Sequence, residues 1–267
     1  MPDSTLLPES YPYNQRYAGV VQHNPQTNEP FIALPSPYSN IRLTPPRVDD
    51  AGEILAIMNN LEMVMNFAGP PYPYLQGHCD EWLRDRIREY DSAMVRMAST
   101  NDDAGFLDLF PLRHIREVGE DGVERFLGEV SLTREDGFCE IRDEGARIAK
   151  ANMNISLAPG DLDIVWTFGD YLQPTHHGRG IMTAAVKTVI ESWAIPHMNA
   201  YKFWAATFPE NVGSQKVFLK NGFQIVDRVV GAAQFPQSKG GYIRDSVIFH
   251  RNMPISASSY ERKSNCL

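Results

Sequence analysis

The stretch His177-Gly178-Arg179-Gly180-Ile181-Met182-Thr183 decides the fold, because its two glycines join a strand pattern to a helix pattern. Residues 162–168, which precede it, are rich in β-branched and aromatic side chains and predict a strand. Residues 180–194, which follow, carry apolar side chains at helical spacing, and Pro196 stands just beyond them. Backbone N–H groups at a glycine turn before a helix can bind an anion, so the stretch predicts a phosphate site or, equally, a structural turn.

Two well-known glycine motifs do not fit this stretch. A Walker loop would place Lys and then Ser or Thr after the last glycine, whereas Ile181-Met182-Thr183 follows Gly180. A dinucleotide-binding fingerprint would need a third glycine near Thr183 and an acidic residue about twenty residues later, at the end of the next strand. The loop therefore matches neither the Walker motif nor the dinucleotide-binding motif.

The remaining pattern predicts a mixed α/β domain around this stretch. Its order is one strand, two helices, three strands and then an alternation of strands and helices. Asp49 or Asp50 is expected to cap the first helix, and Asn211 the last one, which ends at Asn221-Gly222. The other expected strands are 41–43, 106–110, 125–132, 201–207 and two late ones near 224–226 and 242–251.

Composition divides the chain into three parts. Nine of the 19 prolines lie within the first 46 residues, which predicts an extended Pro-rich arm over residues 1–39. The folded domain is expected over residues 40–253, interrupted by a charged insertion at 134–160, and residues 254–267 are expected to form a flexible tail.

Two motifs in order resemble the GNAT acetyltransferases. Trp166-Thr167-Phe168 followed by residues 177–185 resembles motif A of that family. Residues 211–223, in which Asn211 and Ser214 precede Lys220-Asn221-Gly222-Phe223, resemble motif B of its RimJ/RimL-like branch. The resemblance covers about residues 40–250. It implies a mixed, mostly antiparallel central sheet that is splayed at the cofactor strand and flanked by helices.

The resemblance also implies acetyl-CoA as the co-substrate and assigns its contacts. They are Trp166, Thr167, Phe168, His177, Gly178, Arg179, Gly180, Ile181, Met182, Thr183, Asn211 and Ser214. Three residues depart from the family pattern. His177 stands where Gln or Arg is usual, Met182 where Gly or Ala is usual, and Phe218 where many members carry a catalytic Tyr.

The implied reaction is direct transfer of an acetyl group to an amine, and it sets three chemical needs. The amine must lose a proton, and Glu129 or Asp163 is the expected base, although a solvated carboxylate is the commoner role for either. N–H donors, expected at Trp166-Thr167-Phe168, must stabilise the oxyanion. Ser214 is expected to assist the departing thiolate, or equally to bond its own helix backbone. Residues implied to line the acceptor pocket, with an equally strong core interpretation, are Tyr72, Tyr74, Trp82 and 63–67.

Bulk properties exclude several partners. The net charge of −8 disfavours nucleic acid, and no apolar run reaches the roughly 20 residues of a membrane span. Three widely spaced cysteines favour a reducing, cytoplasmic setting. His176-His177 has no third ligand nearby, so no metal is expected.

The sequence leaves the partner and one alternative function open. The acceptor is expected to be a protein N-terminus or a small-molecule amine, and a homodimer stays open. A non-catalytic acyl-CoA-binding module of the same fold is the alternative to an enzyme. A phosphate-binding enzyme of another fold is a third hypothesis.

Overall fold

The computed structural model describes residues 12–99 and 105–254. Within them, a nine-stranded sheet runs in the order β1-β2-β3-β4-β5-β6-β7-β9-β8. Neighbouring strands pair antiparallel except β6 and β7, which are parallel. The strands are β1 (Gln22–His23), β2 (Pro30–Ala33), β3 (Ile41–Thr44), β4 (His114–Val118), β5 (Glu124–Arg134), β6 (Val165–Leu172), β7 (Lys202–Thr207), β8 (Gln224–Gln234) and β9 (Ile243–Asn252).

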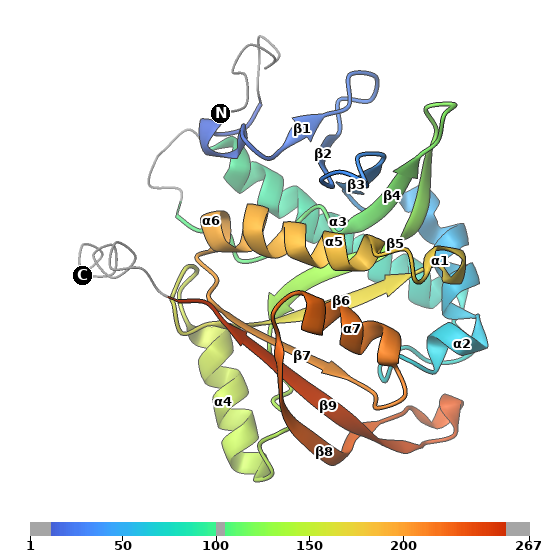
Figure 1. Ribbon diagram of the computed structural model, residues 1–267, viewed down its shortest axis with the longest axis vertical. Coiled ribbons are helices and arrows are strands. Elements are labelled where there is room, and N and C mark those ends of the chain that lie inside the picture. Colours follow the sequence, from blue (N-terminus) through green and yellow to red (C-terminus); the bar gives the residue numbers. More distant parts are fainter. Residues whose placement is uncertain (1–11, 100–104, 255–267) are drawn as a thin grey trace.

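Helices flank this sheet, which confirms the predicted mixed α/β class. In Figure 1, α5 and α7 lie in front of the sheet and α3 passes behind it. A π-helical turn continues α5 from Val189 to Ala194. No helix of the described ranges is long and apolar enough to cross a membrane. The helices are α1 (Ala51–Met58), α2 (Leu61–Val64), α3 (Gln76–Ala98), α4 (Glu144–Ser156), α5 (Ile181–Thr188), α6 (Ile195–Met198) and α7 (Val212–Lys220).

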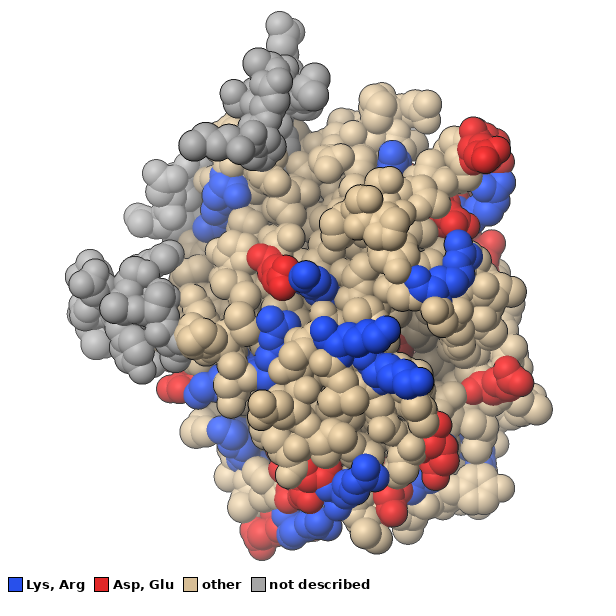
Figure 2. Space-filling model, viewed as in Figure 1, with Lys and Arg blue, Asp and Glu red and all other residues tan. Residues whose placement is uncertain are grey.

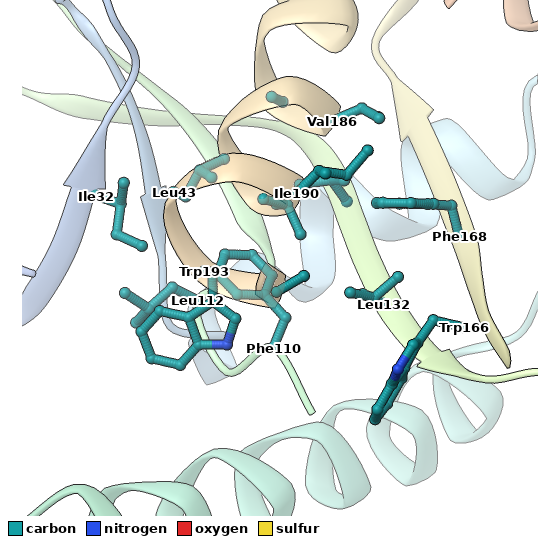
Figure 3. Packing of buried hydrophobic residues seen from close by; sticks show 14 of the residues in the cluster. Ile32, Leu43, Phe110, Leu112, Leu132, Trp166, Phe168, Val186, Ile190 and Trp193 are labelled. Atoms are coloured by element: carbon teal, nitrogen blue, oxygen red, sulfur yellow. The ribbon is translucent and has the colours of Figure 1, made fainter. Parts of the chain in front are cut away.

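The core confirms the helical spacing read after the glycine loop. Val186, Ile190 and Trp193 project from one side of this helix toward the sheet, where Leu132 and Phe168 meet them (Figure 3). Trp193 is fully buried. Burial of these large apolar side chains, each worth about 1.5–3 kcal/mol, fixes the helix that follows the loop against β5 and β6.

One local prediction is wrong, and another holds only for the position of a residue: Asp50 is the N-cap residue of α1. Residues 106–110 form no strand; Leu107 and Phe110 instead bury their side chains from an irregular segment. The partner strand of β5 is β4, and not residues 106–110. The turn at 119–122 joins these two strands and pairs Val118 with Glu124. Asp50 makes no capping bond to α1, because its carboxylate is used elsewhere.

The described part of the predicted arm belongs to the sheet. Residues 12–39 contribute β1 and β2, which pair antiparallel, and β2 then pairs with β3. Tyr17, Val21 and Leu34 are buried in the main core. These residues are therefore packed and not a separate extended arm, because their few apolar side chains cover the edge of the sheet. Residues 1–11 and the predicted tail from 255 onward lie outside the described residues.

The sheet opens between β6 and β7, as the predicted splay requires. Pairing joins Val165 with Lys202, Trp166 with Phe203 and Thr167 with Trp204, and it ends there. Beyond Thr167, β6 continues to Leu172 alongside β5, while β7 continues to Thr207 alongside β9. The edge of β6 from residue 168 to 172 therefore faces a gap in the sheet.

Candidate functional site

The glycine loop has a backbone that only glycine adopts readily. Gly178 and Gly180 have φ of +74° and +83°, in the left-handed region. Gly180 caps α5, which begins at Ile181. A Cβ at Gly180 would collide with the hydroxyl of Tyr38. The loop is therefore closely packed at its second glycine, and the first-turn N–H groups of α5 lie directly after it.

Three side chains hold this loop in place. The Tyr38 hydroxyl donates a hydrogen bond of 2.7 Å to the carbonyl of Arg179. Glu117 lies 3.4 Å from His176 and 3.6 Å from the Arg179 guanidinium. His177 uses its Nε2 on the carbonyl of Leu172, at 2.7 Å. Both His177 and Arg179 were predicted to contact the cofactor. The His177 side chain instead supports the loop, whereas the Arg179 side chain is half exposed.

Positive charge gathers on the same face. Figure 2 shows lysine and arginine side chains grouped over α5 and α7. Lys187 on α5 and Lys216 and Lys220 on α7 are exposed. This local charge contrasts with the net charge of −8 for the whole chain. A polyanion such as a phosphate ester would be attracted to this face of the molecule.

The opening of the sheet shifts the predicted backbone contacts along β6. Trp166 and Thr167 still pair with β7, and the Trp166 side chain is fully buried. The Thr167 hydroxyl is hydrogen-bonded to Glu135. Only Phe168 of the three predicted residues reaches the open edge. Residues 168–172 have no partner on β7, although side chains already bond two of their carbonyls, Ser131 that of Gly169 and His177 that of Leu172.

A cavity of about 220 Å³ lies beside this stretch of β6. Phe67, Tyr74 and Trp82, which the resemblance implied, line it and also pack in or against a core cluster, whereas Tyr72 does not line it. The walls are mostly apolar and come from α1, α3, the segment between α2 and α3, and β6. The other lining residues are Ile54, Met58, Pro70, Arg113, Glu129, Ser131, Gly169, Asp170 and Tyr171. Several of these come from the two central strands, so the cavity adjoins the opening of the sheet.

Glu129 reaches the cavity, but its charge is already paired. Its carboxylate lies 2.7 Å from Arg113 Nε and is 5% exposed as a residue. Arg113 also lies 3.1 Å from Glu89. Two carboxylates thus share one guanidinium, and Glu129 faces the cavity already engaged in an ion pair.

Asp170 is a functional candidate that the sequence prediction missed. It lies in the open part of β6 and lines the cavity. Burial, and next the negative charge of Glu129, raise the pKa of its carboxyl to about 6. A signal existed: Asp170 is the one charged residue within Val165–Leu172, but the predicted strand ended at residue 168. Perturbed carboxyls of this kind are common at catalytic sites.

The remaining catalytic candidates lie apart from the cavity. Asp163 precedes β6, is exposed, and pairs with Lys202 at 2.8 Å. Ser214 lies half-buried in the first turn of α7. Its N–H donates to Asn211 Oδ1 at 3.1 Å, so Asn211 is confirmed as the cap of that helix. The structure thus brings Glu129 to the cavity and does not bring Asp163 there.

A buried ion network supports one wall of the cavity. Asp50 binds Arg116 through both carboxylate oxygens at 2.7 Å and also lies 2.7 Å from His114. His114 stacks on Trp82 with ring centroids 5.9 Å apart. Because Trp82 lines the cavity, this network fixes its ring from behind. No group of three metal-ligating side chains occurs among the described residues.

The comparisons with known proteins agree with this geometry. The family model described as "Acetyltransferase (GNAT) domain" matches residues 40–224. The probable N-acetyltransferase YjcK of Bacillus subtilis (strain 168) is 38% identical over 55 residues, 21% of this chain. The match covers only 30% of the length of that curated relative.

Solved structures show the same fold at low sequence identity. The ribosomal-protein-S5-alanine acetyltransferase of Vibrio fischeri has a TM-score of 0.54 at 15% identity, covering 80% of this chain and 93% of that one. The acetyltransferase MccE, solved with acetyl-CoA and AMP, gives 0.53 at 15%, with 80% and 93% covered. RimL, the ribosomal L7/L12 α-N-protein acetyltransferase, gives 0.56 at 11%, with 87% and 99% covered.

Proposed function

The chain belongs to the GNAT acetyltransferase domain family, whose model matches residues 40–224, and we propose that it is an N-acetyltransferase that uses acetyl-CoA. The observation that carries the proposal is the opening of the sheet between β6 and β7. The glycine loop and α5 lie on one side of it, and a cavity with carboxylates lies beside it. A thioester could therefore enter from the phosphate side and meet an amine in the cavity.

In this proposal the cofactor lies along the face of α5 and α7. The N–H groups at Gly178, Gly180 and the first turn of α5 hold the pyrophosphate, because a helix N-terminus favours anions. The exposed lysines of the two helices attract the remaining phosphate. The open edge of β6, residues 168–172, pairs with the amides of the pantetheine arm and supplies N–H donors to the thioester carbonyl.

Asp170 is the proposed proton acceptor. The neutral amine attacks the thioester carbonyl and the C–S bond then breaks, forming an amide and releasing the CoA thiolate. The proton lost by the amine passes to the Asp170 carboxylate, directly or through water. Its pKa of about 6 suits a base that must be ionised near pH 7. Glu129, paired with Arg113, orients this region and raises the basicity of Asp170.

Ser214 is retained as the proposed hydrogen-bond donor to the departing thiolate. It lies at the start of α7, where the helix N-terminus also stabilises negative charge. Asn211 caps that helix and positions the serine backbone. Asp163 is left out of the scheme, because its ion pair with Lys202 keeps it outside the cavity.

The acceptor is proposed to be a primary amine without a neighbouring carboxylate. The cavity walls are mostly apolar, and Arg113, the one arginine among the described residues that line it, is paired with two glutamates. A small-molecule amine and a protein N-terminus both fit this description; the solved relatives named above for ribosomal proteins favour the second. The buried thiol of Cys79, free in the structure, supports a reducing, cytoplasmic location.

Two measurements test the proposal. Calorimetry with CoA, ATP and NAD should show binding of CoA alone, and absence of CoA binding would refute the cofactor assignment. Free-thiol release from acetyl-CoA is then followed with spermidine, glucosamine, tyramine and a peptide with a free N-terminal alanine. Acetylated product, identified by mass spectrometry, is expected for at least one amine. CoA binding without turnover on any of the four would instead favour a non-catalytic acyl-CoA-binding module.

A further inference from the structure

A buried lysine connects two distant parts of the chain beside the cavity. Lys239 lies in the short helical turn Gln237–Lys239 at the tip of the β8–β9 hairpin and is 6% exposed. Its Nζ donates to the carbonyl of Val64 at 3.0 Å and to that of Phe67 at 2.6 Å. In Figure 1 the hairpin tip lies next to α2, in agreement with these bonds.

The two carbonyls lie at the end of a short helix and just beyond it. α2 ends at Val64, whose carbonyl also accepts the N–H of Phe67 at 3.2 Å, and Phe67 itself follows three residues later. The Lys239 ammonium adds a donor to both carbonyls, as basic side chains near helix C-termini do. Among the described residues, no carboxylate pairs with Lys239, and the Phe235 ring lies 5.3 Å from its Nζ. Burial lowers the pKa of this lysine to about 8.

Neighbouring residues of the hairpin bind the same segment. Arg244 Nη1 donates to the carbonyl of Met65 at 2.8 Å. The N–H of Tyr72 donates to Ser238 Oγ at 3.2 Å. Four hydrogen bonds from one hairpin thus attach residues 64–72, which have no long helix or strand of their own.

This attached segment carries two residues of the cavity wall. Phe67 and Pro70 line the cavity together with residues of β5 and β6. Phe67 also packs edge-on against Tyr171, with ring centroids 5.8 Å apart. The position of this wall relative to the open stretch of β6 therefore depends on the hairpin.

We propose that Lys239 is a positioning residue for acceptor binding, which anchors residues 64–72 to the β8–β9 hairpin and so fixes Phe67 and Pro70 at the cavity. The proposal rests on the proposed function for its link to an acceptor. The glycine loop lies on the face of α5 and α7, so anchoring by Lys239 should affect the amine and leave acetyl-CoA binding intact.

The experiment compares Lys239→Met with the full-length chain and with Arg125→Gln as a control. The methionine keeps an unbranched side chain only one atom shorter than that of lysine and removes every donor. Arg125 is half exposed in an ion pair with Asp121 and is not among the residues that line the cavity. Hydrogen exchange of the amides in residues 64–72 is measured together with acceptor KM, kcat and acetyl-CoA Kd, using the best amine of the panel above.

The expected result is faster exchange confined to residues 64–72, and an acceptor KM raised about ten-fold, with acetyl-CoA Kd unchanged within about two-fold. Arg125→Gln should alter none of these values. Unchanged exchange would overturn the proposal, as would faster exchange with an unchanged acceptor KM. A parallel loss of acetyl-CoA affinity would also overturn it, because it would indicate a general loss of structure.

Two further measurements keep the proposal testable if the main variant does not fold or if no amine is turned over. If Lys239→Met does not fold, Arg244→Met, which removes the bond to Met65 together with an exposed ion pair to Glu210, should change exchange and acceptor KM in the same direction by a smaller factor. If the wild-type protein turns over no amine, the proposed function has failed. The exchange rates of residues 64–72 then decide alone whether Lys239 anchors them.

Discussion

Replacing Asp170 with Asn tests the chemistry of the cavity most directly, because it removes one proton acceptor and keeps the shape of the side chain. The carboxyl has a pKa of about 6, so about nine-tenths of it is ionised at pH 7. A positioned general base contributes about 100-fold to 10,000-fold to a rate. We therefore expect Asp170→Asn to lower kcat by about 100-fold or more, with acetyl-CoA Kd nearly unchanged.

The pH profile separates a base from a merely structural residue. Below the pKa of the acceptor amine, log kcat/KM rises with a slope of about one, because the amine must be neutral. Below about pH 6 the wild type must also ionise Asp170, so its slope should increase to about two. Asp170→Asn should keep a slope of about one throughout. A wild-type slope of one at every pH, or a bend at pH 6 that persists in the variant, would refute the assignment.

A second variant tests the electrostatic origin of this pKa. The charge of Glu129 contributes to raising the pKa of Asp170. Glu129→Gln removes that charge and leaves more of the Arg113 charge uncompensated, and both changes favour the ionised form of Asp170. The bend in the profile should therefore move to lower pH. Asp163→Asn, at an exposed carboxylate outside the cavity, should leave the profile as it is.

Three other variants probe the rest of the proposed site. Gly180→Ala should raise acetyl-CoA Kd about ten-fold or more in calorimetry, because its Cβ meets Tyr38 and its φ is +83°; Tyr38→Phe should have a smaller effect. Ser214→Ala should lower kcat about ten-fold at unchanged acetyl-CoA Kd, and an unaltered kcat would limit the serine to a structural role. Burial opposes ionisation of Asp50, but hydrogen bonds from His114 and Arg116 hold its pKa well below the usual value of 3.8. Its stabilising contribution is therefore complete above about pH 4 and is lost as the pH falls further. In urea unfolding, Asp50→Asn should cost about 3–5 kcal/mol at pH 7 and progressively less in acid; a difference independent of pH would contradict this.

Local signals in the sequence were sufficient for the elements around the glycine loop. The cap at Asn211 and the helix after Gly180 depend on residues within a few positions of each other, so spacing alone predicts them. The short strand at β3 followed from the same kind of pattern. The cavity-lining residues Phe67, Tyr74 and Trp82 were suggested by family resemblance alone, because nothing local distinguishes a pocket aromatic from a core aromatic.

Predictions failed where partners distant in the chain decide the structure. The position at which β7 leaves β6 depends on how β9 pairs with β7, so the open edge could not be placed at residues 168–172 in advance. Because the predicted strand ended at residue 168, the prediction also missed Asp170. Asp50 had the sequence signature of a cap but is recruited by Arg116, 66 positions away along the chain. Lys239 gave no signal, because its carbonyl partners precede it by more than 170 residues.

The hydrogen bond from Tyr38 to the loop carbonyl of Arg179 has a practical consequence for anyone dissecting this protein. The family match begins at residue 40, so a fragment cut at that boundary would look complete by homology. It would nevertheless lose the tyrosine that packs against Gly180, and it would strip β1 and β2 from the sheet. β3 would then become a bare edge open to self-association. If such a fragment bound the cofactor weakly or aggregated, the cause would be the loss of the first 39 residues and not a property of the intact enzyme.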